Sequence, residues 1–150
     1  MRVIIQRVNK ASVTVKNETV SKIDKGLLIL LGITHEDSSE DVQWLVKRIF
    51  SLKLFDSSEK PLSKTIGDSQ MEILLISQFT LFASSKKGTK LSFLNAAKPE
   101  KAKMLYNEFR DNLAYQARGK VKEGEFGAYM DVESINSGPL TIIIDSKNRE

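Results

Sequence analysis

The spacing of apolar residues predicts strands in the first part of the chain. Residues 3–8 and 11–15 are predicted to be strands, and residues 11–15 alternate apolar and polar positions, as expected for a strand with one buried face. Asn9 and Lys10 would form a short turn between them. Residues 27–33 are apolar at every position, which is typical of a central strand buried on both faces.

Three more strands are predicted farther along the chain. Residues 73–81 start with an unbroken apolar run. Residues 128–133 alternate again, and residues 140–144 are almost wholly apolar. The last two strands would be separated by the segment that contains Gly138 and Pro139.

Two helices are predicted between these strands. Ser38 and Asp41 resemble a capping box, and the apolar residues that follow have helical spacing: Val42, Leu45, Val46, Ile49 and Phe50. A second helix would start at Pro99 and stop by Gly119. Strands at both ends with two helices between them predict an α+β protein, in which two main helices cover a largely antiparallel sheet or split β-barrel. No linker is predicted, so we expect residues 1–150 to form one domain.

The composition excludes several kinds of catalytic chemistry. The chain has no cysteine and one histidine, His35, so thiol nucleophiles, disulfides, iron–sulfur clusters and cysteine-based zinc sites are impossible. A Ser-His-Asp triad would need His35, but no nucleophile signature lies nearby, and an incidental loop histidine is favoured. We therefore expect no metal and no cofactor. No apolar segment is long enough for a signal peptide or a membrane span, which predicts a cytosolic protein without a membrane partner.

The charge pattern is compatible with a polyanionic partner but does not require one. The net charge is +4, and lysines gather in one region: Lys86, Lys87, Lys90, Lys98, Lys101 and Lys103. The chain has no dense basic tail of the kind found in non-specific DNA-binding proteins, so we do not expect DNA as a partner. A solvated face of the protein would explain the lysines equally well.

Two short segments place unusual residues next to core strands. Ser77, Gln78 and Thr80 add hydroxyl and amide groups to the end of a buried strand, where they either face a pocket or leave the core for solvent. Gly138 and Pro139 follow a strand, and an X-Pro bond tolerates the cis form. A simple hairpin turn is the alternative there.

Together these two segments resemble the signatures of one enzyme family, the D-aminoacyl-tRNA deacylases. Ser77-Gln78-Phe79-Thr80-Leu81 is similar to the family's SQxTL motif, and Asn136-Ser137-Gly138-Pro139-Leu140-Thr141 is similar to its NxGPxT motif. The resemblance covers nearly the whole chain and includes residues 6–8, 11–15, 26–33 and 124–130. It implies a carboxylic ester hydrolase that removes D-amino acids, and glycine, from tRNA.

One segment departs from the family pattern. The family usually has a Gly-x-Arg-Pro-Ser-Phe-like stretch after its first motif, whereas residues 88–93 of this chain read Gly-Thr-Lys-Leu-Ser-Phe. Lys90 keeps the positive charge without the bidentate fork of arginine, and Leu91 lacks the rigidity of proline. The change concerns contact with tRNA and leaves the pocket unaffected.

The resemblance also implies roles for single residues in a homodimer. Gly138 and Pro139, joined by a cis bond, would enter the partner's pocket beside Ser77, Gln78, Phe79 and Thr80, and would exclude the side chain of an L-amino acid. Arg7 would hold the inserted motif. Phe126 and Asn136 would lie at the substrate site. The 2′-OH of the tRNA would assist hydrolysis while backbone N–H groups near Gln78 and Phe79 stabilise the oxyanion.

Three alternatives remain open on the sequence alone. Thr80 would be a covalent nucleophile if a base lay beside it, but the sequence shows no obvious one. A non-catalytic tRNA-binding module would use the same lysines, although the usual RNA-binding motifs are missing. A paralogue that edits tRNA bearing a wrong L-amino acid would replace the glycine of the Gly-Pro pair, and Gly138 argues against it.

Overall fold

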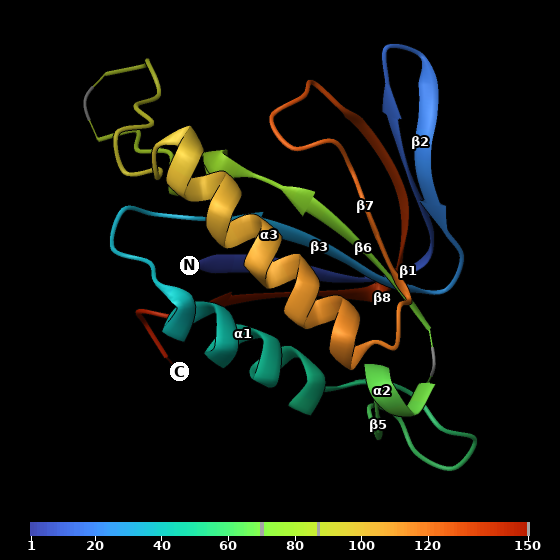
Figure 1. Cartoon of the computed structure of the whole chain (residues 1–150). Coiled ribbons are helices and arrows are strands. Elements are labelled where there is room, and N and C mark those ends of the chain that lie inside the picture. The colour runs from blue at the N-terminus through green and yellow to red at the C-terminus, as the bar shows by residue number, and fades with distance from the viewer. Residues whose placement is uncertain (70, 87, 150) are drawn as a thin grey trace.

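The first strand, β1 (Arg2–Val15), organises the sheet (Figure 1). Along one edge it pairs antiparallel with β3 (Gly26–Gly32) and then with β2 (Glu18–Ile23). Along its other edge it pairs antiparallel with β8 (Asp131–Asp145) over nearly its whole length. The structure is a computed structural model that describes residues 1–69, 71–86 and 88–149, so Lys87 of the lysine group lies outside the described residues.

Two further strands make the sheet mixed and curl it. β6 (Glu72–Ser77) runs parallel to β3, and β7 (Val121–Glu123) runs parallel to β6. The ends of the sheet meet, because the Ser21 hydroxyl of β2 donates a hydrogen bond to the Glu123 carbonyl oxygen of β7 at 2.5 Å. The sheet is therefore a nearly closed, split barrel, and the predicted α+β class is confirmed.

Two helices lie side by side on one face of the sheet (Figure 1): α1 (Ser39–Ser51) and α3 (Pro99–Gln116). The predicted start of α1 is confirmed, since the Ser38 N–H donates to Asp41 Oδ2 at 2.9 Å. The predicted start of α3 at a proline is confirmed as well. No helix among the described residues has both the length and the apolar composition needed to cross a membrane.

A small excursion joins α1 to the next strand of the main sheet. It consists of β4 (Lys53–Phe55), β5 (Lys64–Thr65) and the short helix α2 (Ile66–Ser69). β4 and β5 pair antiparallel as a separate two-stranded sheet. The sequence pattern did not predict these short elements, nor β2 and β7, because each is too short for a clear periodicity.

Apolar residues on both faces of β3 fill two separate cores, as predicted. Leu27, Ile29 and Leu31 belong to the cluster between the sheet and the two long helices. Leu28 belongs to a second cluster inside the curled sheet. Alternate residues of one strand therefore stabilise both layers, which explains why no position of the strand is polar.

The turn predicted at Asn9 and Lys10 is wrong. β1 continues through both residues, because β8 pairs with its first and second halves alike. The pairing register shifts between Val8 and Lys10, so the irregularity is a bulge that bends the strand instead of reversing it.

Two other predicted boundaries also need correction. The strand predicted over residues 73–81 ends at Ser77, where a turn begins. The two C-terminal strands form one element, β8, which continues past Gly138 and Pro139, whereas residues 128–130 are not in a strand. The hairpin alternative is therefore wrong too, since both halves of β8 pair with β1 in the same direction.

Candidate active site

The strand β6 ends in a tight turn that lies at the rim of the barrel. The Gln78 N–H donates to the Leu31 carbonyl oxygen at 2.8 Å and fixes the start of the turn to β3. A 3₁₀ turn, η1 (Phe79–Phe82), follows and is closed by the Leu81 N–H, which donates to the Gln78 carbonyl at 3.2 Å. The backbone thus leaves the core abruptly, and Phe79 is 56% exposed.

The two polar side chains at the start of this turn, Gln78 and Thr80, contact each other. The amide nitrogen of Gln78, Nε2, donates a hydrogen bond to the Thr80 hydroxyl oxygen. Across the part of the chain that the structure describes, this amide is the only side-chain partner found for Thr80. An amide nitrogen has no basic lone pair, so it cannot accept the hydroxyl proton.

An apolar pocket of about 530 Å³ opens beside the turn. Its lining includes Ser77, Gln78 and Phe79 of the first signature, together with Phe126. Four aromatic rings contribute to it in two contacting pairs: Phe79 with Phe93, at a centroid distance of 5.1 Å, and Tyr106 with Phe126, at 5.2 Å. The structure therefore brings together four residues that the sequence assigned to the site.

Tyr106 is a pocket residue that the sequence did not single out. Burial raises the pKa of its phenol far above the ordinary value, and the negative charge of Glu123 adds to the shift. The hydroxyl also donates to the Leu75 carbonyl oxygen at 3.4 Å. Tyr106 is thus a neutral, fixed support for Phe126, and its place on the buried face of α3 was the signal available in the sequence.

His35 lies in an exposed loop, as predicted, and also lines the pocket. A hydrogen bond joins its Nε2 atom to the Leu94 carbonyl oxygen. A carbonyl only accepts, so Nε2 is the nitrogen that bears hydrogen. The Thr34 hydroxyl donates to the neighbouring Asn95 carbonyl at 2.6 Å. Two hydrogen bonds therefore join the segment at Leu94 and Asn95 to the loop after β3.

The lysines of the sequence analysis lie near the pocket but differ in their environments. Lys98 lines it directly, whereas the ammonium group of Lys101 donates to the His35 carbonyl oxygen. Lys90 is exposed in a loop that Ser84 and Ser92 close through two backbone hydrogen bonds of 2.8 and 2.9 Å. One edge of the pocket is therefore basic.

The second signature forms a projection on β8. The Gly138-Pro139 peptide bond is cis, and both residues are exposed. The pairing partner of β1 changes from Thr141 to Asn136 between Gln6 and Val8, so the intervening residues bulge out of the sheet. Gly138 has φ of +124°, which residues with a side chain rarely adopt.

Asn136 closes the base of this projection. Its side-chain amide donates to the Thr141 hydroxyl at 2.8 Å, and its Oδ1 atom accepts the Leu140 N–H at 3.2 Å. Both contacts are within the second signature. In the single chain Asn136 therefore shapes the turn, and it is not part of the lining of the pocket described above.

Arg7 connects the projection to the body of the protein. Its Nε atom donates to the Ser137 carbonyl oxygen at 3.3 Å, and its Nη1 atom donates to the Leu54 carbonyl oxygen at 3.0 Å. Asp56 accepts a longer contact at 3.4 Å. A backbone hydrogen bond from Leu62, with a further contribution from Arg7, keeps the pKa of Asp56 below its ordinary value.

The two signatures are far apart within one chain. Arg2 of β1 donates to the Leu81 carbonyl of the first signature, and Arg7 donates to Ser137 in the second. Arg2 and Arg7 are five positions apart on an extended strand, so their Cα atoms are separated by roughly 17 Å. The pocket lining accordingly includes neither Gly138 nor Pro139.

Comparisons with known proteins agree with the resemblance noted in the sequence. The profile of the family described as D-Tyr-tRNA(Tyr) deacylase matches residues 4–145. A D-aminoacyl-tRNA deacylase of Bacteroides fragilis is 50% identical over 150 residues, which is the full length of both chains. One from Fusobacterium nucleatum is 48% identical over 148 residues, 99% of this chain and 97% of the relative.

Two solved structures have the same fold. A protein described as the c-Myc DNA unwinding element binding protein is 41% identical, with a TM-score of 0.91, and the match covers 97% of this chain and 98% of that one. A probable eukaryotic D-amino acid tRNA deacylase is 17% identical, with a TM-score of 0.84, over 95% of this chain and 97% of that one. The second likeness concerns the fold alone.

Proposed function

The chain belongs to the D-Tyr-tRNA(Tyr) deacylase family, and we propose that it hydrolyses the ester bond of D-aminoacyl-tRNA and of glycyl-tRNA. The products are the free amino acid and tRNA. The observation that best supports this activity is the apolar pocket beside η1, which adjoins the signature residues Gln78 and Phe79. Since aminoacyl-tRNA is used by ribosomes, the reaction would take place in the cytosol.

The pocket suits the 3′-terminal nucleoside of a tRNA. Its volume of about 530 Å³ is within the range of small-molecule sites, and its lining is aromatic and apolar. Proteins bind unstacked bases of RNA between aromatic side chains, with phosphates held by nearby cations. Phe79, Phe93 and Phe126 would contact the base, and Lys98 at the edge would face the phosphate.

The chemistry of the turn favours hydrolysis assisted by the substrate. Among the described residues, the Gln78 amide is the only side-chain partner of the Thr80 hydroxyl and is no base, so the neighbouring 2′-OH of the terminal ribose would act on the ester instead. The Gln78 N–H is already donated to Leu31, so it is not available to an oxyanion. Phe79 and Thr80 precede the first hydrogen-bonded N–H of the turn, and their amides are the donors that would stabilise the developing charge.

Chirality would be read by a second copy of the chain. Gly138 and Pro139 do not line the pocket of their own chain, so the motif of a partner would complete each site. Its carbonyl groups would occupy the space that the side chain of an L-amino acid needs. A D-amino acid would direct its side chain elsewhere, and glycine would not be rejected because it has none.

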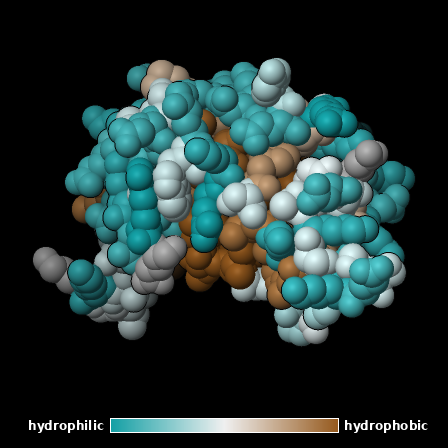
Figure 2. Space-filling model, turned by 90° about the horizontal axis from the view of Figure 1, so that it is seen from below, coloured by the Kyte–Doolittle hydropathy of each residue, from teal (hydrophilic) through white to brown (hydrophobic). Residues whose placement is uncertain are grey.

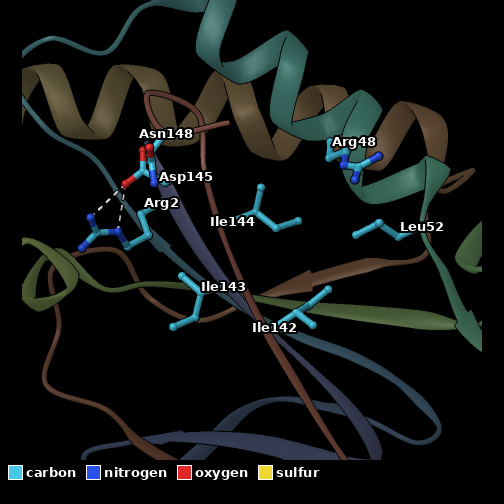
Figure 3. A pocket seen from close by; sticks show the side chains of 8 residues that line it. All are labelled: Arg2, Arg48, Leu52, Ile142, Ile143, Ile144, Asp145 and Asn148. Atoms are coloured by element: carbon cyan, nitrogen blue, oxygen red, sulfur yellow. Dashed lines mark hydrogen bonds and ion pairs between the residues drawn. The ribbon is translucent and has the colours of Figure 1, made fainter. Parts of the chain in front are cut away.

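The exposed surface of β8 is suited to such a dimer. Among the described strands only β1 pairs with β8, so its other edge is free, and Val132, Ile135 and Ile143 are 38%, 48% and 66% exposed. Figure 2 shows hydrophobic surface within a hollow on the underside of the molecule, framed by polar residues. One hollow of about 500 Å³ lies between α1 and the end of β8, with Leu52 and Ile142 in its lining (Figure 3).

Single-turnover hydrolysis of D-tyrosyl-, L-tyrosyl- and glycyl-tRNA tests the activity. We expect cleavage of the first and third substrates and not of the second. A tRNA-binding module would cleave none of them, and a paralogue specific for L-amino acids would prefer a mischarged L-substrate. Inertness toward glycyl-tRNA alone would refute exclusion and indicate recognition of the D-side chain.

Mixed dimers test the composite site. Gly138→Ala damages the projection, and Ala102→Phe fills the pocket of the other chain, so each pure variant should lose most of its activity. An equal mixture, unfolded and refolded together, should regain about a quarter of the wild-type rate, because half of the dimers then hold one intact site. A mixture as inactive as its parents would refute the composite site. Sedimentation should show one species of twice 16.9 kDa.

A further inference from the structure

Arg2 makes three contacts that join the first signature to the end of β8. Its Nη1 atom donates to the Leu81 carbonyl oxygen at 2.8 Å. Its Nε and Nη2 atoms reach Oδ2 of Asp145 at 3.0 and 2.9 Å (Figure 3). The guanidinium carbon also lies 4.9 Å from the centre of the Phe82 ring. One side chain of β1 thus contacts both the turn and the last strand.

The contact with Leu81 satisfies a backbone group that the turn itself leaves open. Within η1 and its caps, the Gln78 carbonyl accepts the Leu81 N–H, and the Thr80 carbonyl accepts the Ala83 N–H. Carbonyl groups at the end of a helical turn have no partner inside it. Arg2 supplies a charged donor at this place, and charge-assisted hydrogen bonds are stronger than neutral ones.

Asp145 fixes the orientation of Arg2. Burial alone would raise the pKa of Asp145, but hydrogen bonds from the Lys147 N–H and from Arg2 outweigh it and lower the pKa. The lowered pKa keeps this carboxylate, which is 15% exposed, ionised at neutral pH, and its hydrogen bonds hold it in place. The guanidinium is planar, so a contact with Asp145 on one edge sets the direction of the Nη1 donor.

We propose that Arg2 is a positioning residue for the deacylation reaction, acting through the Leu81 carbonyl to hold η1 in its reactive geometry. The proposal rests on the proposed function, because it assigns catalytic importance to the backbone of this turn. Arg2 does not line the pocket, so it would act on the step of ester cleavage and little on the binding of substrate. It would do for the first signature what Arg7 does for the second.

The test compares Arg2→Met, Arg2→Lys and the control Arg48→Met. Met keeps much of the apolar stem and removes every donor, whereas Lys keeps the charge but not the planar fork. Arg48 lines the same hollow as Arg2, and the structure records no contact between its side chain and the turn. Arg48→Met therefore controls for loss of positive charge in the hollow and at a dimer interface.

The measurement is single-turnover cleavage of D-tyrosyl-tRNA at several enzyme concentrations. For Arg2→Met we expect the saturating rate to fall about tenfold, with the half-saturating concentration changed by less than about twofold. Arg2→Lys should fall by a smaller factor, and it keeps the test meaningful if the Met variant does not fold. A wild-type rate in both Arg2 variants would overturn the proposal, as would an equal loss in Arg48→Met.

A second readout does not depend on the activity. In nitrogen-15 NMR spectra, the amide signals of Phe79 and Thr80 should shift in Arg2→Met and stay unchanged in Arg48→Met. If the wild-type enzyme fails to cleave D-tyrosyl-tRNA, the proposed function fails, yet these shifts still report whether Arg2 holds the turn. Unchanged Phe79 and Thr80 signals in Arg2→Met would overturn the proposal by themselves.

Discussion

The two signature turns differ in how the fold supports them. The turn η1 follows β6, a strand with neighbours on both sides, and the N–H of Gln78 just before it is bonded to β3. The Gly138-Pro139 projection lies on β8, which has a free edge among the described strands, and its tip is exposed. The first turn adjoins a pocket built by its own chain, whereas the second has no pocket of its own to serve.

Both turns nevertheless depend on arginines from the same strand. Arg2 reaches the first turn and Arg7 reaches the second, and each donates to a backbone carbonyl oxygen. One continuous strand thus sets the positions of both motifs. In the proposed dimer, the two motifs of one chain would nevertheless belong to two different active sites. Steric exclusion of L-amino acids requires that both the pocket and the projection are held rigidly, because a mobile projection would admit both enantiomers.

The largest effect is expected when the projection itself is changed. In Gly138→Ala the new Cβ would lie 3.1 Å from the Leu140 amide nitrogen and 3.2 Å from Arg7 Nη2, at a φ of +124°. Strain at such a position costs about 1–3 kcal/mol, so we expect the rate on D-tyrosyl-tRNA to fall by up to about a hundredfold.

Gly119→Ala is the matched control for this change. Gly119 also has a positive φ, of +80°, and it is not part of the pocket lining. A Cβ there would meet nothing within 4 Å. The control should lose some stability and keep its deacylation rate. Equal losses of activity in the two variants would show that backbone strain in general, and not the shape of the projection, lowers the rate.

The next effect concerns stability at acidic pH. We expect it for Asp41 and not for Asp56, the carboxylate beside Arg7. Burial raises the pKa of Asp41, but hydrogen bonds from Ser146, Lys147 and the Ser38 amide outweigh it and hold the pKa well below its ordinary value. This buried carboxylate of α1 therefore fixes the chain just after β8, next to Asp145.

A folded-state pKa below the unfolded value means that the stabilisation is present above about pH 4 and is lost as the pH falls below it. We expect Asp41→Asn to lower the free energy of unfolding at pH 7 by on the order of 2 kcal/mol, and by less at pH 3. Asp56→Asn, beside Arg7, is the control and should change little, because that carboxylate is exposed. Urea titrations at both pH values measure the difference.

A smaller effect is expected when the support of the projection is removed. Arg7→Ala takes away the donors to Ser137 and Leu54, and the side chain that makes them is only 16% exposed. We expect cleavage of D-tyrosyl-tRNA to fall about tenfold and cleavage of L-tyrosyl-tRNA to rise relative to it. A ratio of the two rates equal to that of the wild type would show that Arg7 does not control selectivity.

The sequence predicted the elements with strong periodicity and missed the local geometry of the site. The alternation in the second half of β1, the doubly apolar β3 and the two long helices were correctly predicted because burial imposes their patterns. The end of β6 was not, because Gln78 leaves the strand through a backbone bond to Leu31 that no side-chain pattern encodes.

The candidate site shows the same division. The motifs identified Ser77, Gln78, Phe79 and Phe126, which the structure places around one pocket. Arg2 was not identified, although it is only five residues from Arg7. Its importance depends on contacts with Leu81 and Asp145, which are 79 and 143 residues away in sequence, and a single sequence does not reveal such pairings.

The smallest effect is expected at the residue that looks most like a nucleophile. The only side-chain partner that the described residues offer Thr80 is the Gln78 amide, which donates to its oxygen and cannot take its proton. Thr80→Ala should therefore remove one hydrogen bond and lower the single-turnover rate by no more than about tenfold. Thr80→Ser keeps the hydroxyl and should restore most of the rate, since the same bond can form.

An essential nucleophile behaves differently: its loss lowers the rate by a factor of about a thousand or more, and an acyl-enzyme accumulates on rapid quenching. Mass spectrometry of the quenched wild-type enzyme separates the two cases, because a mass increase equal to one aminoacyl group on Thr80 would place the covalent step in this turn, whereas an unmodified chain leaves the ester to the 2′-OH of the substrate.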